Sequence, residues 1–336
     1  MKRRIAHPAI AIINLALVGF LLLPAQSLAA SPPLQTPEVA GEADVTSAIT
    51  TGTYYDSGWV PLAQGTCETV THDLGGNPDD YTVEMWFQDT NATGFGINRR
   101  GYGGTDLTGS QEGAHWEQLT SDTIDLCRGP LDTAADQVRA RVWIPARAAD
   151  FASPWTPIEQ GLTIGFLHNL NLPPEQLIVS LWFKSAERGI HHLGYGGLDI
   201  DGFREMRGAY WHELTDNAVH VTRRNDDEDV EEVRVLVAQA GPPNYDSDWQ
   251  PLFVGPNLFR HNLIWHPDDM LVQVECFVPA ACIHQKYVGG NEDWLFGRQG
   301  TSLQNLAAHS LNLVRWHDDQ VCPQARVRIW QRSDFV

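Results

Sequence analysis

The sequence has little positive charge. It contains 23 Lys and Arg residues against 42 Asp and Glu residues, which gives a formal net charge of −19. Nucleic acids and anionic lipid surfaces attract proteins through a basic field, so this balance excludes both as principal partners. The chain also lacks a short compositional period, and its hydrophobic content is an ordinary 43%. These features exclude a collagen-like, coiled-coil or disordered protein and predict a globular one.

Long hydrophobic runs are missing except at Ala9–Leu23, near the N-terminus. Basic residues precede this run and small residues follow it, which is the pattern of a secretory signal peptide cleaved after Ala29. The run is shorter than the roughly 20 residues of a membrane span, which leaves an uncleaved anchor as the alternative. We expect a secreted protein with a signal peptide at 1–29, a proline-containing linker at 30–53 and no transmembrane anchor after cleavage.

Catalytic signatures are missing as well. The sequence has no G-x-S-x-G elbow, phosphate-binding loop, H-E-x-x-H pair or dinucleotide fingerprint. Adjacent carboxylates occur in expected turns, where they diverge, whereas glycosidase carboxylates converge across a cleft. These pairs are expected to be solvated, with calcium binding as the alternative because oxygen ligands gather there. The pairs are Asp79/Asp80, Asp226/Asp227, Asp268/Asp269 and Asp318/Asp319. We therefore expect a protein that is not an enzyme and holds no cofactor.

The chain repeats itself three times after the linker. An opening segment containing Trp59, Trp155 or Trp249, a Gly-Gly loop and a closing strand follow one another in each copy. Copies of about 90 residues are large enough to bury their own cores. Each of the three tryptophans is expected to cover one end of the core of its repeat. The predicted domains are 54–145, 151–239 and 245–332.

The periodicity within a copy is that of strands. Val83, Met85 and Phe87 alternate with the residues between them, and segments 177–184 and 270–276 keep the same alternation. No helical spacing is sustained. The fold class predicted is all-β, with three tandem antiparallel β-sandwiches after the signal peptide.

The five cysteines of an expected secreted chain predict disulfides with one thiol left over. Cys67 and Cys127 face the same outer side of their strands and are expected to pair. Cys276 takes the core position of Phe87 and is expected to be a buried free thiol. That leaves Cys282 and Cys322 to pair between loops. Their spacing does not fit a zinc site.

The Gly-Gly loops carry the candidate ligand-binding residues. Each loop places basic or amide donors beside a tyrosine, with an acidic residue after it. Aromatic rings and fixed polar groups suit a neutral polyhydroxylated ligand, although turn architecture alone is the alternative. The candidates are Arg99, Arg100, Tyr102 and Asp106 in the first copy, His191, His192, Tyr195 and Asp199 in the second, and Lys286, Tyr287 and Glu292 in the third.

The copies resemble the H-type lectin domain family. The resemblance is carried by an Asp-Ser-Gly-Trp opening, the turn from Thr71 to Pro78, a Val-x-Met-Trp-Phe strand and the closing pair from Thr120 to Ile144. It implies a six-stranded antiparallel β-sandwich that binds galactose-type sugars, commonly as a trimer. It covers three tandem, divergent copies.

These observations predict a secreted, lectin-like protein that binds glycans or glycoconjugates in recognition or adhesion. Tethered copies would raise avidity without new contacts. The alternative is a secreted structural or protein-binding β-sandwich array without sugar binding. Because the connectors between copies are short, we expect a monomeric pseudo-trimer whose copies pack about an approximate axis.

Overall fold

Strands make up nearly all the regular structure. The computed structural model describes residues 54–91, 94–106, 111–145, 147–200, 205–278, 282–289, 291–293 and 297–334. The expected signal peptide and linker lie outside the described residues. Within the described ranges the only helices are short 3-10 turns, so the all-β prediction is confirmed. No helix in this part of the chain is long and apolar enough to cross a membrane.

The same order of elements occurs three times. The first repeat contains β1 (Tyr54–Asp56), β2 (Val60–Pro61), β3 (Cys67–Thr71), η1 (Pro78–Asp80), β4 (Thr82–Gln88), β5 (Ile97–Asn98), β6 (Thr105–Asp106), β7 (Gln111–Glu112), β8 (Ala114–Glu117), β9 (Thr123–Arg128) and β10 (Gln137–Trp143). The second contains β11 (Phe151–Ala152), β12 (Thr156–Pro157), β13 (Thr163–Leu167), η2 (Pro174–Gln176), β14 (Leu177–Ser185), β15 (Gly189–His191), β16 (Leu198–Ile200), β17 (Glu205–Arg207), β18 (Ala209–His212), β19 (Ala218–Arg223) and β20 (Glu232–Gln239). The third contains β21 (Tyr245–Asp246), β22 (Gln250–Pro251), β23 (Gly255–Arg260), η3 (Pro267–Asp269), β24 (Met270–Val278), β25 (Cys282–His284), β26 (Asn291–Asp293), β27 (Gly297–Gln299), β28 (Thr301–Gln304), β29 (Ser310–Arg315) and β30 (Gln324–Gln331), followed by η4 (Arg332–Asp334).

Each repeat builds a larger and a smaller antiparallel sheet. In the first repeat the larger sheet has the order β1-β10-β4-β5 with β2 also on β10, and the smaller has the order β3-β9-β8. The other repeats pair their corresponding strands in the same way. A separate hairpin, β6–β7 in the first repeat, completes each set. The described part of each repeat thus holds ten strands, more than the six that the lectin resemblance implied.

The predicted alternation places the core between the two sheets. Met85 and Phe87 are fully buried, as are Ile124 and Leu126 of the smaller sheet. The intervening side chains of β4, such as Glu84, point to the opposite face of the larger sheet. That second face is covered by the neighbouring repeats, and the described residues belong to one compact unit of the chain. The division into three separate domains stays a prediction.

An Arg-x-x-x-Asp motif supports the end of each sandwich. The arginine Nε lies 2.7–2.8 Å from the aspartate Oδ2, and its Nη1 donates to a main-chain carbonyl after the opening segment. The aspartate also accepts at least two main-chain N–H groups, for example Gly208 N at 2.6 Å and Val230 N at 2.8 Å for Asp227. Both oxygens of each buried carboxylate therefore accept hydrogen bonds from protein donors. The pairs are Arg128–Asp132, Arg223–Asp227 and Arg315–Asp319.

The second disulfide differs from the prediction. Cys67 is bonded to Cys127, as predicted, and Cys276 is bonded to Cys322. The expected Cys282–Cys322 pair and the free thiol at Cys276 are therefore wrong. The side chain of Cys282 lies outside the described residues.

Cys322 faces the core because of the Arg-x-x-x-Asp motif. Its N–H donates to Asp319 Oδ2 at 2.9 Å, and Ala135 and Val230 make the same bond in the other repeats. All three residues are fully buried. The loop that looked superficial in the sequence thus turns a side chain inward, where the core-facing Cys276 meets it.

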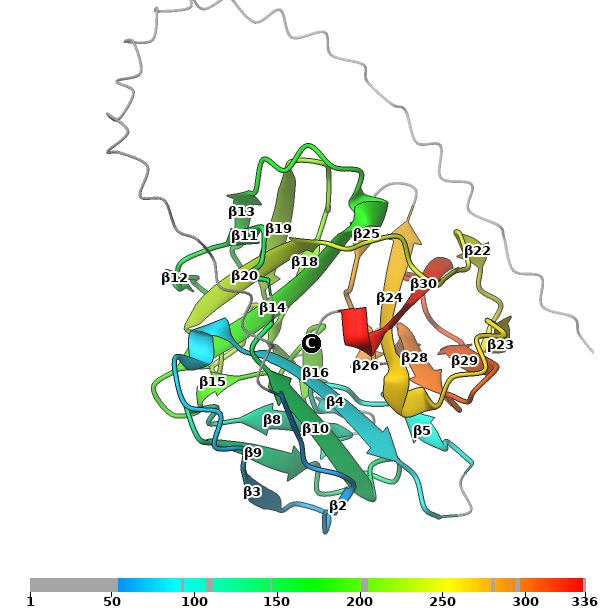
Figure 1. Ribbon diagram of the computed structural model, residues 1–336, viewed down its shortest axis with the longest axis horizontal. Helices are drawn as coiled ribbons and strands as arrows, with labels where there is room; N and C mark the ends of the chain where they lie inside the picture. Colours follow the sequence, from blue (N-terminus) through cyan, green and yellow to red (C-terminus); the bar gives the residue numbers. More distant parts are fainter. Residues whose placement is uncertain are drawn as a thin grey trace, which may run out of the picture. The chain divides into compact units, whose positions relative to one another are not determined.

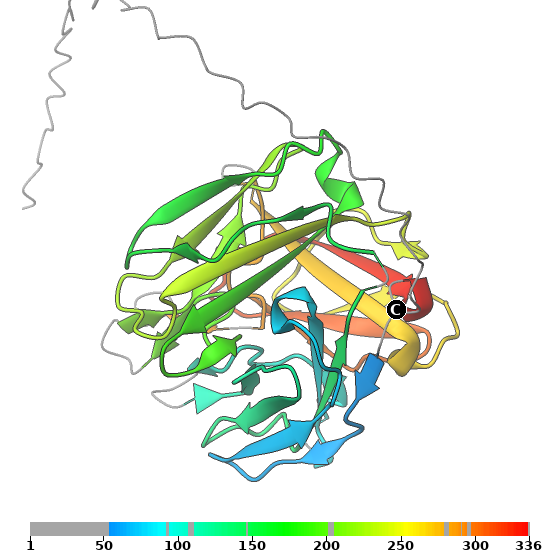
Figure 2. The same cartoon turned by 60° about the vertical axis from the view of Figure 1, so that its left-hand side comes forward.

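The three repeats are arranged around a common centre (Figures 1 and 2), and main-chain hydrogen bonds join the edges of their sheets. The end of each smaller sheet meets the short edge strand of the next larger sheet. The bonds are Leu119 N to Ile190 O at 3.1 Å, Leu214 N to Ile283 O at 3.4 Å and Leu306 N to Ile97 O at 2.9 Å. Repeat 1 thus bonds to repeat 2, repeat 2 to repeat 3 and repeat 3 back to repeat 1.

The 3-10 turns make a second cyclic set of contacts. Each turn, or the residue that follows it, lies against an arginine on the last strand of the next repeat. The pairs are Asp79 with Arg234 at 2.8 Å, Leu177 O with Arg328 Nη2 at 2.9 Å, and Asp268 with Arg141 at 3.2 Å. Trp155 Nε1 also donates to Asp79 at 2.9 Å, and Trp59 packs against the core of repeat 3. Trp155 therefore also contacts the neighbouring repeat, and the cluster that Trp59 contacts includes Trp86 of its own repeat besides residues of repeat 3, whereas Trp249 packs against Phe277 of its own repeat.

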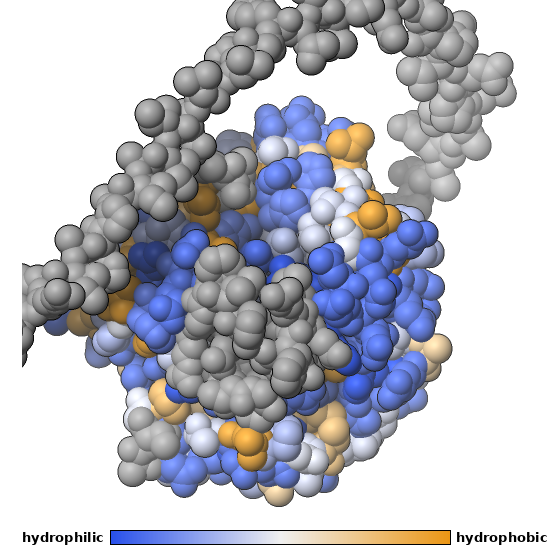
Figure 3. Space-filling view, turned by 180° about the vertical axis from the view of Figure 1, so that it is seen from behind, coloured by the Kyte–Doolittle hydropathy of each residue, from blue (hydrophilic) through white to orange (hydrophobic). Residues whose placement is uncertain are grey.

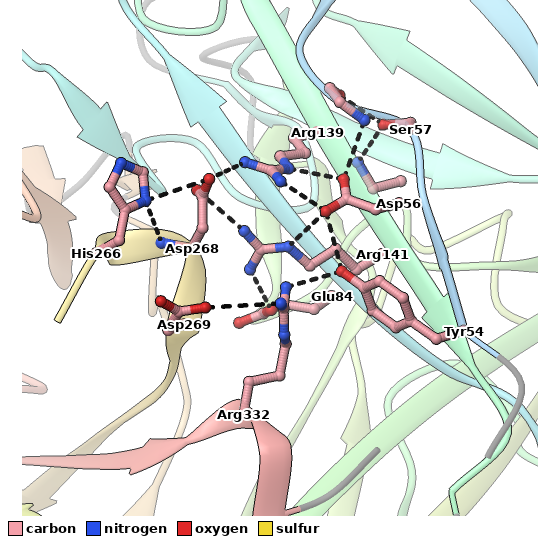
Figure 4. A network of polar contacts seen from close by, with 12 residues as sticks. Tyr54, Asp56, Ser57, Glu84, Arg139, Arg141, His266, Asp268, Asp269 and Arg332 are labelled. Carbon is pink, nitrogen blue, oxygen red and sulfur yellow. Dashed lines mark hydrogen bonds and ion pairs between the residues drawn. The ribbon is translucent and has the colours of Figure 1, made fainter. Parts of the chain in front are cut away.

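A connected network of charged side chains lies at the seam between the first and third repeats (Figure 4). Asp268 contacts Arg139 at 2.5 Å as well as Arg141, whose side chain is 1% exposed. Arg332 donates to Tyr54 Oη at 2.7 Å, so residues from the two ends of the described chain also meet here. No connector joins these two repeats directly, and noncovalent contacts alone close this seam.

We expect Asp227→Asn to lower the free energy of unfolding by about 3–5 kcal/mol, because it leaves the buried Arg223 without its counter-charge. Urea unfolding followed by tryptophan fluorescence measures the change. Glu228→Gln alters charge equally in the same loop at a side chain that is 72% exposed, and should change stability by less than about 0.5 kcal/mol. Equal effects of the two substitutions would contradict the role given to Asp227.

Asp268→Ala is expected to weaken ring closure by about 1–3 kcal/mol, because Arg139 and Arg141 lose charge-assisted hydrogen bonds across the seam. Asp269→Ala is the matched control, since that carboxylate is 54% exposed and lies 3.8 Å from Arg332. Thermal unfolding should separate the two variants by several degrees. A midpoint for Asp268→Ala equal to that of the control would exclude a closing role.

Candidate functional site

The three Gly-Gly loops bind one another through their main chains. The loop of each repeat donates an N–H to the loop carbonyl of another repeat, and the three bonds form a closed ring. They run from Gly101 N to Gly289 O at 2.8 Å, from Gly194 N to Gly103 O at 2.9 Å and from Tyr287 N to Gly196 O at 2.8 Å. A second ring of bonds surrounds the first, including His192 N to Trp116 O at 3.0 Å. The loops predicted to hold a ligand therefore first hold the repeats together.

Glycine is required where each loop crosses the start of the following strand. A Cβ atom on Gly113 would lie 1.9 Å from Gly101 O, and one on Gly208 would lie 1.8 Å from Gly194 O. Both distances are far below van der Waals contact. Only glycine lets the two backbones approach this closely.

The third loop is shifted by one residue from the alignment expected from the sequence. Tyr102 forms a bridge with Ala114 and Tyr195 with Ala209, but in the third repeat Val288 makes the equivalent bridge. Tyr287 instead occupies the left-handed position of Gly101, with φ of 57°. The three loop tyrosines are therefore not equivalent, and only two of them stand at the centre of the ring.

A cavity of about 920 Å³ lies on the second faces of the larger sheets. All three repeats line it. Near the loops its lining includes Arg99, Tyr102, His192, Tyr195 and Gln285. The first four of these belong to the set predicted from the sequence. Its volume is at the upper end of the about 300–1,000 Å³ typical of small-molecule sites.

Aromatic rings pack closely at this floor. The His192 and Tyr195 rings are stacked with centroids 4.1 Å apart, and Tyr102 meets Tyr195 edge-on at 5.7 Å. The Arg99 guanidinium lies 3.9 Å from the centre of the Trp86 ring. Tyr195 Oη donates a hydrogen bond to Gln285 Oε1. These contacts fix the floor side chains before any ligand arrives.

Burial sets the protonation of the floor. It lowers the pKa of His192 to about 3, so the imidazole is neutral near pH 7. It raises the pKa of Tyr102 to about 12 and also raises that of Tyr195, so both phenols keep their protons. The floor thus presents neutral donors and acceptors beside the Arg99 guanidinium, which pairs with Glu84 at 2.9 Å.

Several residues that line the cavity contain buried polar atoms without hydrogen-bond partners. The buried atoms His192 Nδ1, Gln273 Oε1 and Arg99 Nε have no hydrogen-bond partner among the described residues. All three residues line the cavity. The charges of the lining nearly balance, with four carboxylates and three guanidinium groups. They are Asp79, Asp80, Glu84, Asp150, Arg99, Arg147 and Arg234.

Other predicted residues lie away from this cavity. Arg100 pairs with Glu112 at 3.1 Å, and His191 Nε2 lies 2.9 Å from a main-chain carbonyl. Tyr287 Oη accepts a hydrogen bond from Arg224 at 2.9 Å, and the ammonium of Lys286 lies over the Tyr287 ring. Tyr287 thus contacts repeat 2, and the Arg100 guanidinium also lies 5.2 Å from the centre of the Trp316 ring of repeat 3, whereas the His191 contact lies within its own repeat. The side chains of Asp106, Asp199 and Glu292 lie outside the described part of the chain.

The carboxylate pairs are not solvated turns. Asp227 and Asp319 are buried against arginines, and Asp79 and Asp268 pair with arginines across seams. The expectation of solvated carboxylates is therefore wrong for one member of each pair. The one His/Cys/Asp/Glu cluster with metal-ligand spacing among the described residues contains the bonded sulfurs of Cys67 and Cys127, which are not thiolates.

Sequence reasoning missed the walls of the cavity. Glu84, Trp182 and Gln273 stand on the outward parity of strands whose other face is the core. The available signal was that this parity carries Trp and charged residues in place of the small polar residues of a solvated face. A strand in which neither face has the small polar residues of a solvated surface is expected to be buried on both faces.

Comparisons with known proteins gave no relative for this site. No protein-family model matches the chain, and no curated protein or solved structure matches it. The candidate site therefore rests on the geometry of this chain alone.

Stability is expected to fall between about pH 6.5 and 4. Burial lowers the pKa of His191 and His284 to about 4 and that of His192 to about 3. Above the unfolded-state pKa near 6.5 each histidine is neutral in both states, so the free energy of unfolding is at its full value. Below it the unfolded chain binds protons that the buried imidazoles do not, and the free energy of unfolding falls by up to about 1.4 kcal/mol per pH unit for each histidine. Urea midpoints at several pH values measure this slope.

The repeats themselves supply the control for this titration. Asn98 stands at the position of His191, and Gln285 stands at that of His192. The double variant His191→Asn, His192→Gln should flatten the slope. An unchanged slope in a folded double variant would show that other groups cause the acid sensitivity.

Proposed function

We propose that this protein is a secreted, lectin-like protein without catalytic activity and that it binds a neutral carbohydrate in the central cavity. The observation that carries the proposal is the cavity floor, where stacked aromatic rings stand beside polar atoms without partners. Sugar C–H faces stack on rings, and hydroxyl groups need fixed donors and acceptors. The near balance of charge in the lining favours a neutral ligand over an ionic one.

The site accepts one ligand for each chain. Because the loops bond to one another around a common centre, their tyrosines and basic residues contribute to one cavity or to the seams. Three separate sites, one on each repeat, would need loops open to solvent. We therefore propose a monomeric pseudo-trimer with a stoichiometry of one, and the family resemblance makes galactose-type sugars the first to test.

Secretion is part of the same proposal. The two disulfides fit an oxidising compartment, and the basic, apolar and small residues at the N-terminus fit an export signal. On the face drawn in Figure 3, hydrophilic residues cover most of the described surface, which suits an exported protein. The alternative is a secreted structural or protein-binding array in which the repeats serve only as a scaffold.

A glycan array followed by a cavity-blocking variant tests the proposal. Ser180 is half-buried and lines the cavity, so Ser180→Trp should fill the space and lower sugar affinity at least tenfold without removing a floor contact. Thr163→Trp adds the same ring at an exposed site on β13 and should leave affinity unchanged. Calorimetric titration measures both affinity and stoichiometry.

Two results would overturn the proposal. Folded wild-type protein that binds no glycan on the array would favour the scaffold alternative. Sugar binding that survives in folded Ser180→Trp, or that shows three equal sites, would place recognition outside the cavity.

A further inference from the structure

We infer that the ligand of the central cavity is amphiphilic, a glycoside whose sugar lies on the polar floor and whose apolar aglycone lies against the wall of repeat 2. This inference rests on the proposed function and names the ligand class. It starts from a difference between the three repeats. Each repeat contributes the same face of its larger sheet to the centre, and this face is called its wall. Equivalent side chains of the three walls can therefore be compared directly.

The middle pair of each wall differs in chemistry. In repeat 1 this pair is Glu84 with Arg141, which form a salt bridge of 3.0 Å. In repeat 3 it is Gln273 with Arg328. The register places Ser180 opposite Leu236 in repeat 2. The second repeat thus has a small hydroxyl and an apolar side chain where the others have a buried arginine.

The loss of the arginine opens the wall to the cavity. Arg141 and Arg328 are 1% and 0% exposed and contact the 3-10 turn of a neighbouring repeat. The turn that approaches repeat 2 instead meets Arg234, one pair further along β20. Leu236 is consequently half-buried and lines the cavity, which the two arginines do not.

Apolar residues continue outward from Leu236. The next pair in register is Ile178 with Ala238, and the corresponding pair of repeat 3 is Leu271 with Trp330. The connectors between repeats complete this part of the lining. Its apolar members are Ile144, Pro145, Ala148, Ala152, Ile178, Leu236, Ala238, Pro242 and Leu271, and the connectors also contribute the charged residues Arg147 and Asp150.

Polar and apolar parts of the lining are concentrated in different places. Near the loops, atoms without partners among the described residues belong to Arg99, His192 and Gln273, whereas apolar side chains extend outward from Leu236. Arg234 Nε, on the same strand as Leu236, is a further such atom and lies beside the apolar wall. A sugar alone would satisfy the floor and leave the apolar wall in contact with water. A ligand with an apolar extension covers both, and the cavity of about 920 Å³ has room for both parts. Burial of the extension then adds affinity in proportion to the apolar area removed from water.

A series of alkyl glycosides tests the inference in the mature, disulfide-bonded protein. The probes are methyl, hexyl and octyl β-galactosides, the matching β-glucosides, and an octyl oligo(ethylene glycol) ether that carries the same tail without a sugar. All are used below their critical micelle concentrations. Affinity should rise by about fourfold for each methylene that the wall buries, so the octyl glycoside should bind at least tenfold more tightly than the methyl glycoside.

Substitution of the wall locates the tail. Leu236→Gln should reduce the octyl-to-methyl affinity ratio several-fold while leaving methyl glycoside affinity unchanged. Leu258→Gln makes the same change at a leucine that is 56% exposed on β23 and should leave the ratio unchanged. If Leu236→Gln does not fold, the chain-length series on the wild-type protein still decides the question.

The outcomes separate this inference from the function on which it rests. Equal affinity for methyl and octyl glycosides would overturn the amphiphile and leave sugar binding standing. An octyl ether that binds as tightly as the octyl glycoside would overturn the sugar-binding function and with it the glycoside class. No binding of any probe would count against both.

Discussion

The ring of main-chain hydrogen bonds between the Gly-Gly loops is the constraint on which the remaining structure depends. Three bonds of 2.8–2.9 Å fix the repeats around one centre, and glycine at Gly113 and Gly208 permits the close backbone crossing behind them. Once the loops meet, the second faces of the larger sheets must face inward. The cavity is therefore a consequence of loop closure and does not belong to any one repeat.

The seams between the repeats are chemically unequal. Connectors tether repeat 1 to repeat 2 and repeat 2 to repeat 3, whereas repeats 1 and 3 meet without one. That seam has the network in which Asp268 contacts two arginines, while the contact to Arg328 uses main-chain carbonyls. A partly buried ion network is favourable here because its charges are matched and several donors converge on one carboxylate.

The same inequality gives the cavity its asymmetry. If all three walls carried a buried arginine pair, the cavity would be narrower and polar on every side. Replacement of the arginine by Leu236 in repeat 2 opens one apolar wall beside the polar floor. Sequence divergence between the repeats has thus given a nearly symmetric cavity one polar side and one apolar side. The proposed amphiphilic ligand depends on this asymmetry, and the proposed sugar binding depends on the polar side.

The sequence by itself determined the all-β class, the threefold repetition and the Cys67–Cys127 pairing, because alternation and repeat spacing are local properties that each strand carries with it. It also singled out Arg99, Tyr102, His192 and Tyr195 as candidates. Only the tertiary structure brought these four residues to one floor, placed Arg100 and Tyr287 at the seams and left His191 bonded within its own repeat.

Tertiary structure also decided the Cys276–Cys322 bond and the burial of Asp227 and Asp319. The physical reason is that these outcomes depend on which backbone lies opposite a side chain. From its sequence context, Asp227 is expected to be solvated, but Arg223, four residues earlier, pairs with it in the folded chain. Cys322 is likewise expected at the surface, but its N–H bonds to Asp319 and its side chain faces the core. Contacts across repeats have no fixed sequence separation, so local spacing does not determine them.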